Sequence, residues 1–184
     1  MFRIVHRRRE ERLFAPLLPL VEGHTVADGP GRRAVEGSHR GRPLRAAYVR
    51  GDALFGSGSP ESAALETHMF DLIASAVPGA ADWGVSYGRD GSGLGARHWR
   101  TVVSDPELEA RLLGAGVMEL LDAAGAFPQV RYEAGLARLT LRKEIAPRRV
   151  PTAEGFAAQL ALLDQVVALN FAVNPPPGLA LGPP

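Results

Sequence analysis

The residues best suited to recognition chemistry are arginines in two glycine-containing stretches, residues 35–51 (VEGSHRGRPLRAAYVRG) and 88–97 (GRDGSGLGAR). The guanidinium group presents its hydrogen-bond donors in a rigid fork that matches phosphate and carboxylate oxygens. In the first stretch the arginines surround a predicted hairpin turn, and in the second they flank a loop rich in backbone amides that suit an anion nest. We therefore predict an anion-binding patch at Arg40, Arg42, Arg45, Arg89 and Arg97.

Two features limit the strength of this predicted anion contact. In a strand, Arg45 lies on the opposite side from Tyr48, as on the wet outer face of any half-buried hairpin. Glu10, Glu11 and Glu36 also lie among the arginines of the first part of the chain. We expect at most a weak, salt-sensitive contact with polyanions, and nucleic-acid binding is not the favoured function.

Sequence motifs for catalysis, cofactors and metals are not found. The run GSHRG at 37–41 lacks the spacer of the G-x-S-x-G nucleophile elbow. The glycines at 88–95 match neither the dinucleotide-binding nor the P-loop pattern, and the histidines form no H-E-x-x-H motif or i,i+4 pair. We assign no catalytic residue, cofactor or metal ligand. The alternative is a small enzyme whose site forms only in the fold, with Asp71, His68 or His98 at the wall of a pocket.

The elements that must position these residues are short strands grouped into hairpins, followed by helices. Ser104 or Asp105 is suited to cap a short helix, and Thr152 is suited to cap the long C-terminal helix. Along the chain we expect a helix at 8–22, a hairpin at 32–49, strands at 82–88 and 98–103, short helices at 104–114 and 117–124, a hairpin at 128–145 and a long helix at 153–172.

The segment 66–76 fits either of two structures. The alternation that begins at His68 is that of a strand, whereas Leu65, Met69 and Leu72 have the spacing of a helix. We favour the strand, because the proline-glycine turn and the sequence DWGVSYG that follow are typical of a β-meander.

These patterns predict a single α+β domain, in which an antiparallel sheet of hairpins is packed against two short helices and a long C-terminal helix. The strand patterns run together along the chain, without the β-α-β alternation of a parallel sheet. The predicted domain spans residues 10–173. A basic segment at 1–9 precedes it, and a disordered tail rich in proline and glycine follows at 174–184.

The long C-terminal helix carries apolar residues well beyond one face. A helix of this kind is buried on several sides or meets another subunit. We therefore predict an oligomer interface, which makes the protein a candidate homo-oligomer. Its residues are Phe156, Leu160, Leu162, Leu163, Val166, Val167, Leu169 and Phe171.

The composition predicts a globular cytoplasmic protein. Hydrophobic residues make up 46% of the chain and charged residues 22%, and cysteine is absent, which fits a reducing compartment. No run of apolar residues reaches the roughly 18–20 of a membrane span. The function we favour is that of a non-enzymatic binding or scaffold module acting through protein–protein contacts, with another protein or with itself.

The order of the predicted elements is similar to that of a group of uncharacterised bacterial proteins. The similarity covers about residues 10–172. It lies in a short helix with leucine and proline, a G-x-x-x-G-R hairpin at 37–42, the sequence SDPELEARLL at 104–113 and a long C-terminal helix. The resemblance implies the same α+β fold, and no established activity comes with it.

Overall fold

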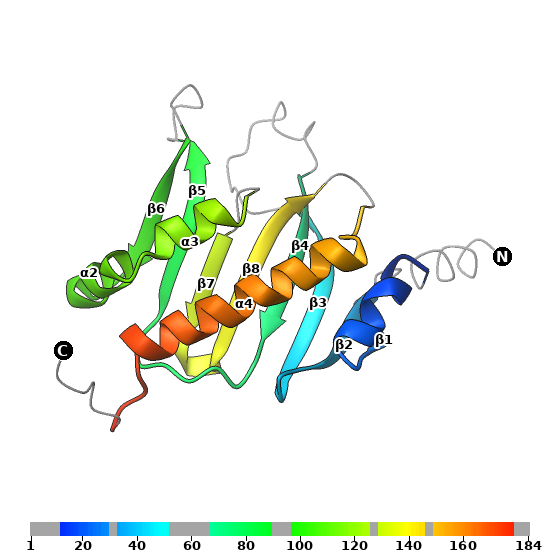
Figure 1. Cartoon of the computed structure of the whole chain (residues 1–184), viewed down its shortest axis with the longest axis horizontal. Coiled ribbons are helices and arrows are strands. Elements are labelled where there is room, and N and C mark those ends of the chain that lie inside the picture. The colour runs from blue at the N-terminus through cyan, green and yellow to red at the C-terminus, as the bar shows by residue number, and fades with distance from the viewer. Residues whose placement is uncertain are drawn as a thin grey trace.

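The fold is built on one open antiparallel sheet. A computed structural model describes residues 12–29, 33–51, 67–89, 97–125, 129–145 and 149–178. The sheet has eight strands in the order β1-β2-β3-β4-β8-β7-β5-β6 (Figure 1). The strands are β1 (His24–Ala27), β2 (Arg33–His39), β3 (Arg42–Gly51), β4 (Thr67–Ala74), β5 (Trp83–Arg89), β6 (Arg97–Val103), β7 (Gln129–Glu133) and β8 (Arg138–Ile145).

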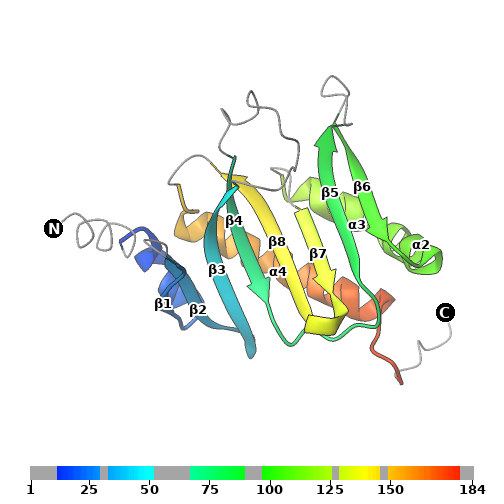
Figure 2. The same cartoon turned by 180° about the vertical axis from the view of Figure 1, so that it is seen from behind.

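Apart from the single-turn 3-10 helix η3 (Ala134–Leu136), which joins β7 to β8, the described helices cover the same face of this sheet. The long helix α4 (Ala153–Val173) crosses it diagonally, with α2 (Pro106–Gly114) and α3 (Val117–Ala123) at the β5–β6 end and the 3-10 helix η1 (Ala15–Leu20) at the β1–β2 end. Figure 2 shows the opposite face, on which no described helix lies. We call these the helix face and the open face. The predicted α+β class and its antiparallel sheet are confirmed.

The ambiguous segment 66–76 contains strand β4, so the strand prediction is confirmed. β4 pairs with β3 on one side and with β8 on the other. Phe70, Leu72 and Ala74 are buried on its helix face, which explains the alternation along the sequence. The expected meander into β5 is wrong, because β8 and β7 lie between β4 and β5.

The predicted N-terminal caps of α2 and α4 both form in the structure. The Asp105 carboxylate accepts a hydrogen bond from the Glu107 amide at 2.9 Å, and the Thr152 hydroxyl accepts one from the Gly155 amide at 3.1 Å. Both contacts satisfy an amide that the first turn of a helix leaves unpaired. Between α2 and α3, Gly116 has a φ of 75°, a conformation that glycine adopts without strain.

The N-terminal helix and the first strand differ from the expectation. Within the helix expected at 8–22, residues 12–14 are α-helical and Ala15–Leu20 form a 3-10 helix, while residues 8–11 lie outside the described residues. Pro16 and Pro19 lack the amide donors that a regular α-helix would use. The short edge strand β1 was not predicted, because four residues carry too little alternation to be recognised.

The C-terminal end of α4 is tied to the connection between β4 and β5. Asn170 is 0% exposed and Asn174 is 2% exposed. The Asn174 side-chain carbonyl accepts hydrogen bonds from the Ala80 and Ala81 amides at 3.2 and 3.0 Å, and its amide group donates to the Ala81 carbonyl at 2.9 Å. Asn174, the first residue of the predicted tail, is therefore part of the folded body, while residues 179–184 lie outside the described residues.

In the described part of the chain, α4 is the one helix long and apolar enough to cross a membrane by length and composition. One flank of α4 packs on the sheet: the rings of Phe156 and Phe70 meet edge to face with centroids 6.0 Å apart. Core helices of globular domains have the same length and composition, so these two features do not identify α4 as a membrane span. That the chain has no membrane span stays a prediction.

Candidate functional site

The three predicted hairpin arginines do not gather on one face. Alternation along β3 places Arg42 on the side of the buried Leu44 and Arg45 on the open face. The Arg45 guanidinium contacts both the Glu36 and the Asp28 carboxylates. Because these two carboxylates balance its positive charge, Arg45 attracts an external anion only weakly.

Arg40 occupies the turn between β2 and β3 and reaches the helix α4. Its Nε lies 3.0 Å from the Asp164 carboxylate, and His39 Nε2 lies 3.0 Å from the same oxygen. Asp164 is the acidic residue in the middle of α4, so these contacts fasten the hairpin tip to the helix. Two of the three arginines are thus used within the chain itself.

The other two predicted arginines lie where two paired strands end. Arg89 of β5 stands opposite Arg97 of β6 in the register of the hairpin. Their side chains and the glycine loop between them lie outside the described residues. The anion nest at this loop stays a prediction.

Most of the predicted oligomer residues belong to the chain's own core. Phe156, Leu160, Leu162, Leu163, Val166 and Val167 are buried against the sheet and its neighbouring helices. Leu169 is half-buried, and Phe171 is 50% exposed. The sheet and the short helices therefore account for most of the apolar breadth of α4 without a second subunit.

The residues named for a hidden enzyme site are held in separate contacts. Arg142 donates two hydrogen bonds to Asp71, at 2.7 and 2.6 Å, on the open face. The hydrogen bonds from Arg142 to this carboxylate raise the pKa of the guanidinium further above its ordinary value. His68 Nδ1 contacts the Tyr48 hydroxyl on the helix face. The side chain of His98 lies outside the described residues.

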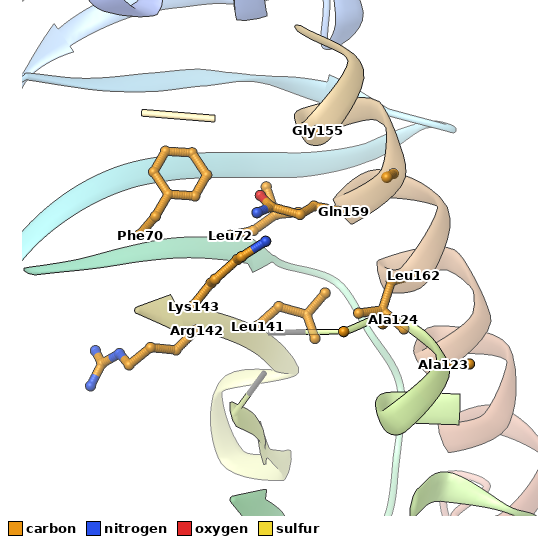
Figure 3. Close-up of a pocket in the computed structure, with 12 residues that line it drawn as sticks. Phe70, Leu72, Ala123, Ala124, Leu141, Arg142, Lys143, Gly155, Gln159 and Leu162 are labelled. Carbon is orange, nitrogen blue, oxygen red and sulfur yellow. The ribbon is translucent and has the colours of Figure 1, made fainter. Parts of the chain in front are cut away.

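A cavity of about 290 Å³ lies between α4 and the helix face of β4 and β8 (Figure 3). Its walls are apolar side chains of the sheet and helix together with the C-terminal end of α3. The apolar lining comprises Phe70, Leu72, Leu141, Leu162, Ala123, Ala124 and Ala158. Neither Asp71 nor His68, two of the residues named for the enzyme alternative, lines this cavity.

Two polar residues at the cavity point toward one another in Figure 3, Lys143 of β8 and Gln159 of α4. Lys143 is the only lysine of the chain and stands opposite Phe70 in the strand register. Within the described residues, no carboxylate pairs with its ammonium group. The Gln159 carbonyl oxygen is buried and has no hydrogen-bond partner there. A cation without a counter-charge and an oxygen without a donor thus share one apolar cavity.

Arg142 also borders this cavity, but its guanidinium points away from Lys143 and Gln159 toward Asp71. The reason is the strand alternation, which sends neighbouring side chains of β8 to opposite faces. Lys143 is therefore the cation that β8 supplies to the cavity.

A second hollow, of about 480 Å³, lies around Gly84 where β5 meets β7. Arg131 and Val102 form part of its lining. The Arg131 guanidinium already lies 3.3 Å from the Glu133 carboxylate. Because its cation is paired, this hollow has less to offer a ligand than the cavity beneath α4.

Sequence reasoning assigned no role to Lys143 or Gln159. One signal was present for each. Lys143 follows the alternation of Leu139 and Leu141, which points it toward the core, and Gln159 interrupts an apolar helix. The sequence does not show that these two residues line the same cavity, because they lie on separate elements.

Comparison with protein-family models, with curated proteins and with solved structures finds no match to this chain. The resemblance to uncharacterised bacterial proteins therefore stays a prediction. Among the described residues, no group of three histidine or acidic side chains is placed to hold a metal ion.

Proposed function

We propose that the protein is a non-enzymatic binding module that holds a small apolar molecule in the cavity between α4 and the strands β4 and β8. The observation that carries the proposal is the cavity itself, about 290 Å³ of space walled mainly by apolar side chains. This volume is at the lower end of the roughly 300–1,000 Å³ of ligand pockets, which combine apolar walls with a few polar groups.

The acids and histidines of the described chain support binding over catalysis. Asp71 is engaged by Arg142, and Asp164 by Arg40 and His39. Each contact joins two elements of the fold, and neither carboxylate lines the cavity. A catalytic site combines a nucleophile or base with a second group that activates it, and Lys143 is the one such group that faces this cavity among the described residues.

The proposal is tested by filling the cavity from the helix. Ala158 lines the cavity, whereas its neighbour Ala157 does not, although both alanines are exposed. We expect 1-octanol to bind the unmodified protein, measured by isothermal titration calorimetry, and we expect Ala158→Trp to abolish binding while Ala157→Trp preserves it. Absence of octanol binding to the unmodified protein, or equal binding by both variants, contradicts the proposed site.

Contact with a second copy of the chain is a further candidate function, favoured by the exposure of Phe171. This aromatic ring is 50% exposed near the C-terminal end of α4, beside the exposed alanines Ala168 and Ala172. Large apolar side chains gathered at a surface mark protein contacts more often than single ones do. Light scattering tests this candidate: a dimer that Phe171→Ser converts to monomer supports it, and a monomer at micromolar concentration removes it.

A further inference from the structure

We infer that the ligand of the cavity is an aliphatic monocarboxylate of about eight carbon atoms, bound through its carboxylate by Lys143. The inference rests on the proposed function and adds to it the charge, size and head group of the ligand. It follows from three properties of the cavity: a cation and a carbonyl oxygen that have no partner among the described residues, and a limited apolar volume.

The charge of the ligand follows from Lys143. Lys143 is half-buried at the cavity, and a nearby anion stabilises an ammonium group that has lost part of its water. Phe70 of β4 pairs with Lys143 in the strand register, and Leu141 lies two residues before Lys143 on the same face of β8. The described chain offers no carboxylate to the ammonium group. An anion brought by the ligand would supply that missing partner.

The head group follows from the number of cations and donors. Lysine has three N–H donors, and among the described residues none of them bonds the Gln159 carbonyl oxygen, which leaves these donors for a ligand. A single ammonium group balances a single negative charge. A carboxylate therefore fits this site better than a doubly charged phosphate.

The length of the ligand follows from the volume. At roughly 30 Å³ for each non-hydrogen atom, the share of a water molecule in liquid water, the cavity accommodates about ten such atoms. Octanoate has this size. Its chain would lie along Leu72, Leu141 and Leu162, which are the larger aliphatic residues of the lining.

The experiment compares octanoate with its neutral isostere octanamide, and with 1-octanol, by isothermal titration calorimetry on the unmodified full chain. We expect octanoate to bind at least about tenfold more tightly than octanamide, because a charge-assisted hydrogen bond is roughly twice as strong as a neutral one. In Lys143→Met this preference should vanish while octanol binding persists. In the control Glu144→Gln, whose side chain points to the open face, the preference should remain.

The outcomes separate the inference from the proposed function. If octanol binds and octanoate binds no more tightly than octanamide, the carboxylate inference is overturned and the proposed function stands. If none of the three molecules binds, both are overturned. A preference for octanoate that survives Lys143→Met removes Lys143 as its cause. The comparison on the unmodified chain decides the head group even where a variant fails to fold. Butyrate and palmitate test the length: tighter binding of either than of octanoate overturns the inferred size.

Discussion

The indole Nε1 of Trp83 donates a hydrogen bond of 2.7 Å to the side-chain carbonyl of Asn170 in the interior of the protein. Asn170 in turn donates to the Pro78 carbonyl at 2.8 Å. One side chain of α4 thereby fixes both the first residue of β5 and the connection that leads to it. This relationship explains why a polar residue occupies a fully buried position on the most apolar helix of the chain.

Replacing Asn170 by alanine should destabilise the fold, because it takes the acceptor from two buried donors, the Trp83 N–H and one N–H of the Asn174 side-chain amide. Each unsatisfied group costs about 1–3 kcal/mol, so we expect a loss of roughly 3 kcal/mol in the free energy of unfolding by urea titration. Gln165→Ala, at an exposed position of the same helix, is the control and should change it by less than about 0.5 kcal/mol. A loss below about 1 kcal/mol for Asn170→Ala contradicts the structural role.

Removing one partner of the Asp71–Arg142 pair should be more harmful than removing both. Asp71 is 7% exposed, and Asp71→Leu leaves the Arg142 cation without its bidentate partner. We expect a loss of about 2–4 kcal/mol for Asp71→Leu and recovery of most of it in Asp71→Leu/Arg142→Leu. The comparison is Arg131, which is 72% exposed and pairs with a Glu133 that Arg138 also binds. Arg131→Ala should cost less than about 1 kcal/mol. Additive losses in the double variant would disprove the coupling.

Tyr132 should make the stability of the protein decrease in alkaline solution. Burial, and secondly the nearby Asp82 charge, raise the pKa of Tyr132 above its ordinary value of 10.0. The unfolded chain therefore loses this proton at a lower pH than the folded chain does. The contribution of Tyr132 is fully present below pH 10 and is lost as the pH rises through the folded pKa.

Urea titrations between pH 8 and about pH 11 measure this effect through the difference between two proteins. Tyr132→Phe also loses the hydrogen bond to the Val77 carbonyl, so its stability is lower throughout and only the slopes are compared. We expect a steeper decrease above pH 10 for the unmodified chain than for Tyr132→Phe. Parallel curves would show that Tyr132 is not protected by burial.

The hairpin arginines should contribute little to polyanion binding. Arg40 contacts Asp164, and Arg45 contacts Glu36 and Asp28, so much of their charge is already balanced. We expect the unmodified chain and Arg40→Ala/Arg42→Ala/Arg45→Ala to elute from heparin at the same low salt concentration. Markedly earlier elution of the triple variant would instead support a polyanion-binding patch, because binding through released counterions weakens as salt rises.

The sequence alone determined those elements whose signals lie within a few neighbouring residues. The caps at Asp105 and Thr152 depend on an amide two or three residues further along the chain. The strand β4 depends on side-chain alternation with a period of two. Such patterns act locally, so they predict the element and its buried face wherever it lies in the fold. They also predicted the α+β class, since grouped strands without β-α-β alternation favour an antiparallel sheet.

Only the tertiary structure decided the order of the strands, because pairing between distant strands depends on long-range packing that no local period encodes. β7 and β8 lie between β4 and β5, although they follow both in the sequence. That arrangement places β8 beneath α4 and brings Lys143 to the same cavity as Gln159. It likewise gives Asp71 its partner Arg142 and buries most of the apolar breadth of α4. Sequence periodicity predicts which face of a strand or helix a side chain occupies. Only the packed fold determines which residue of another element that side chain contacts.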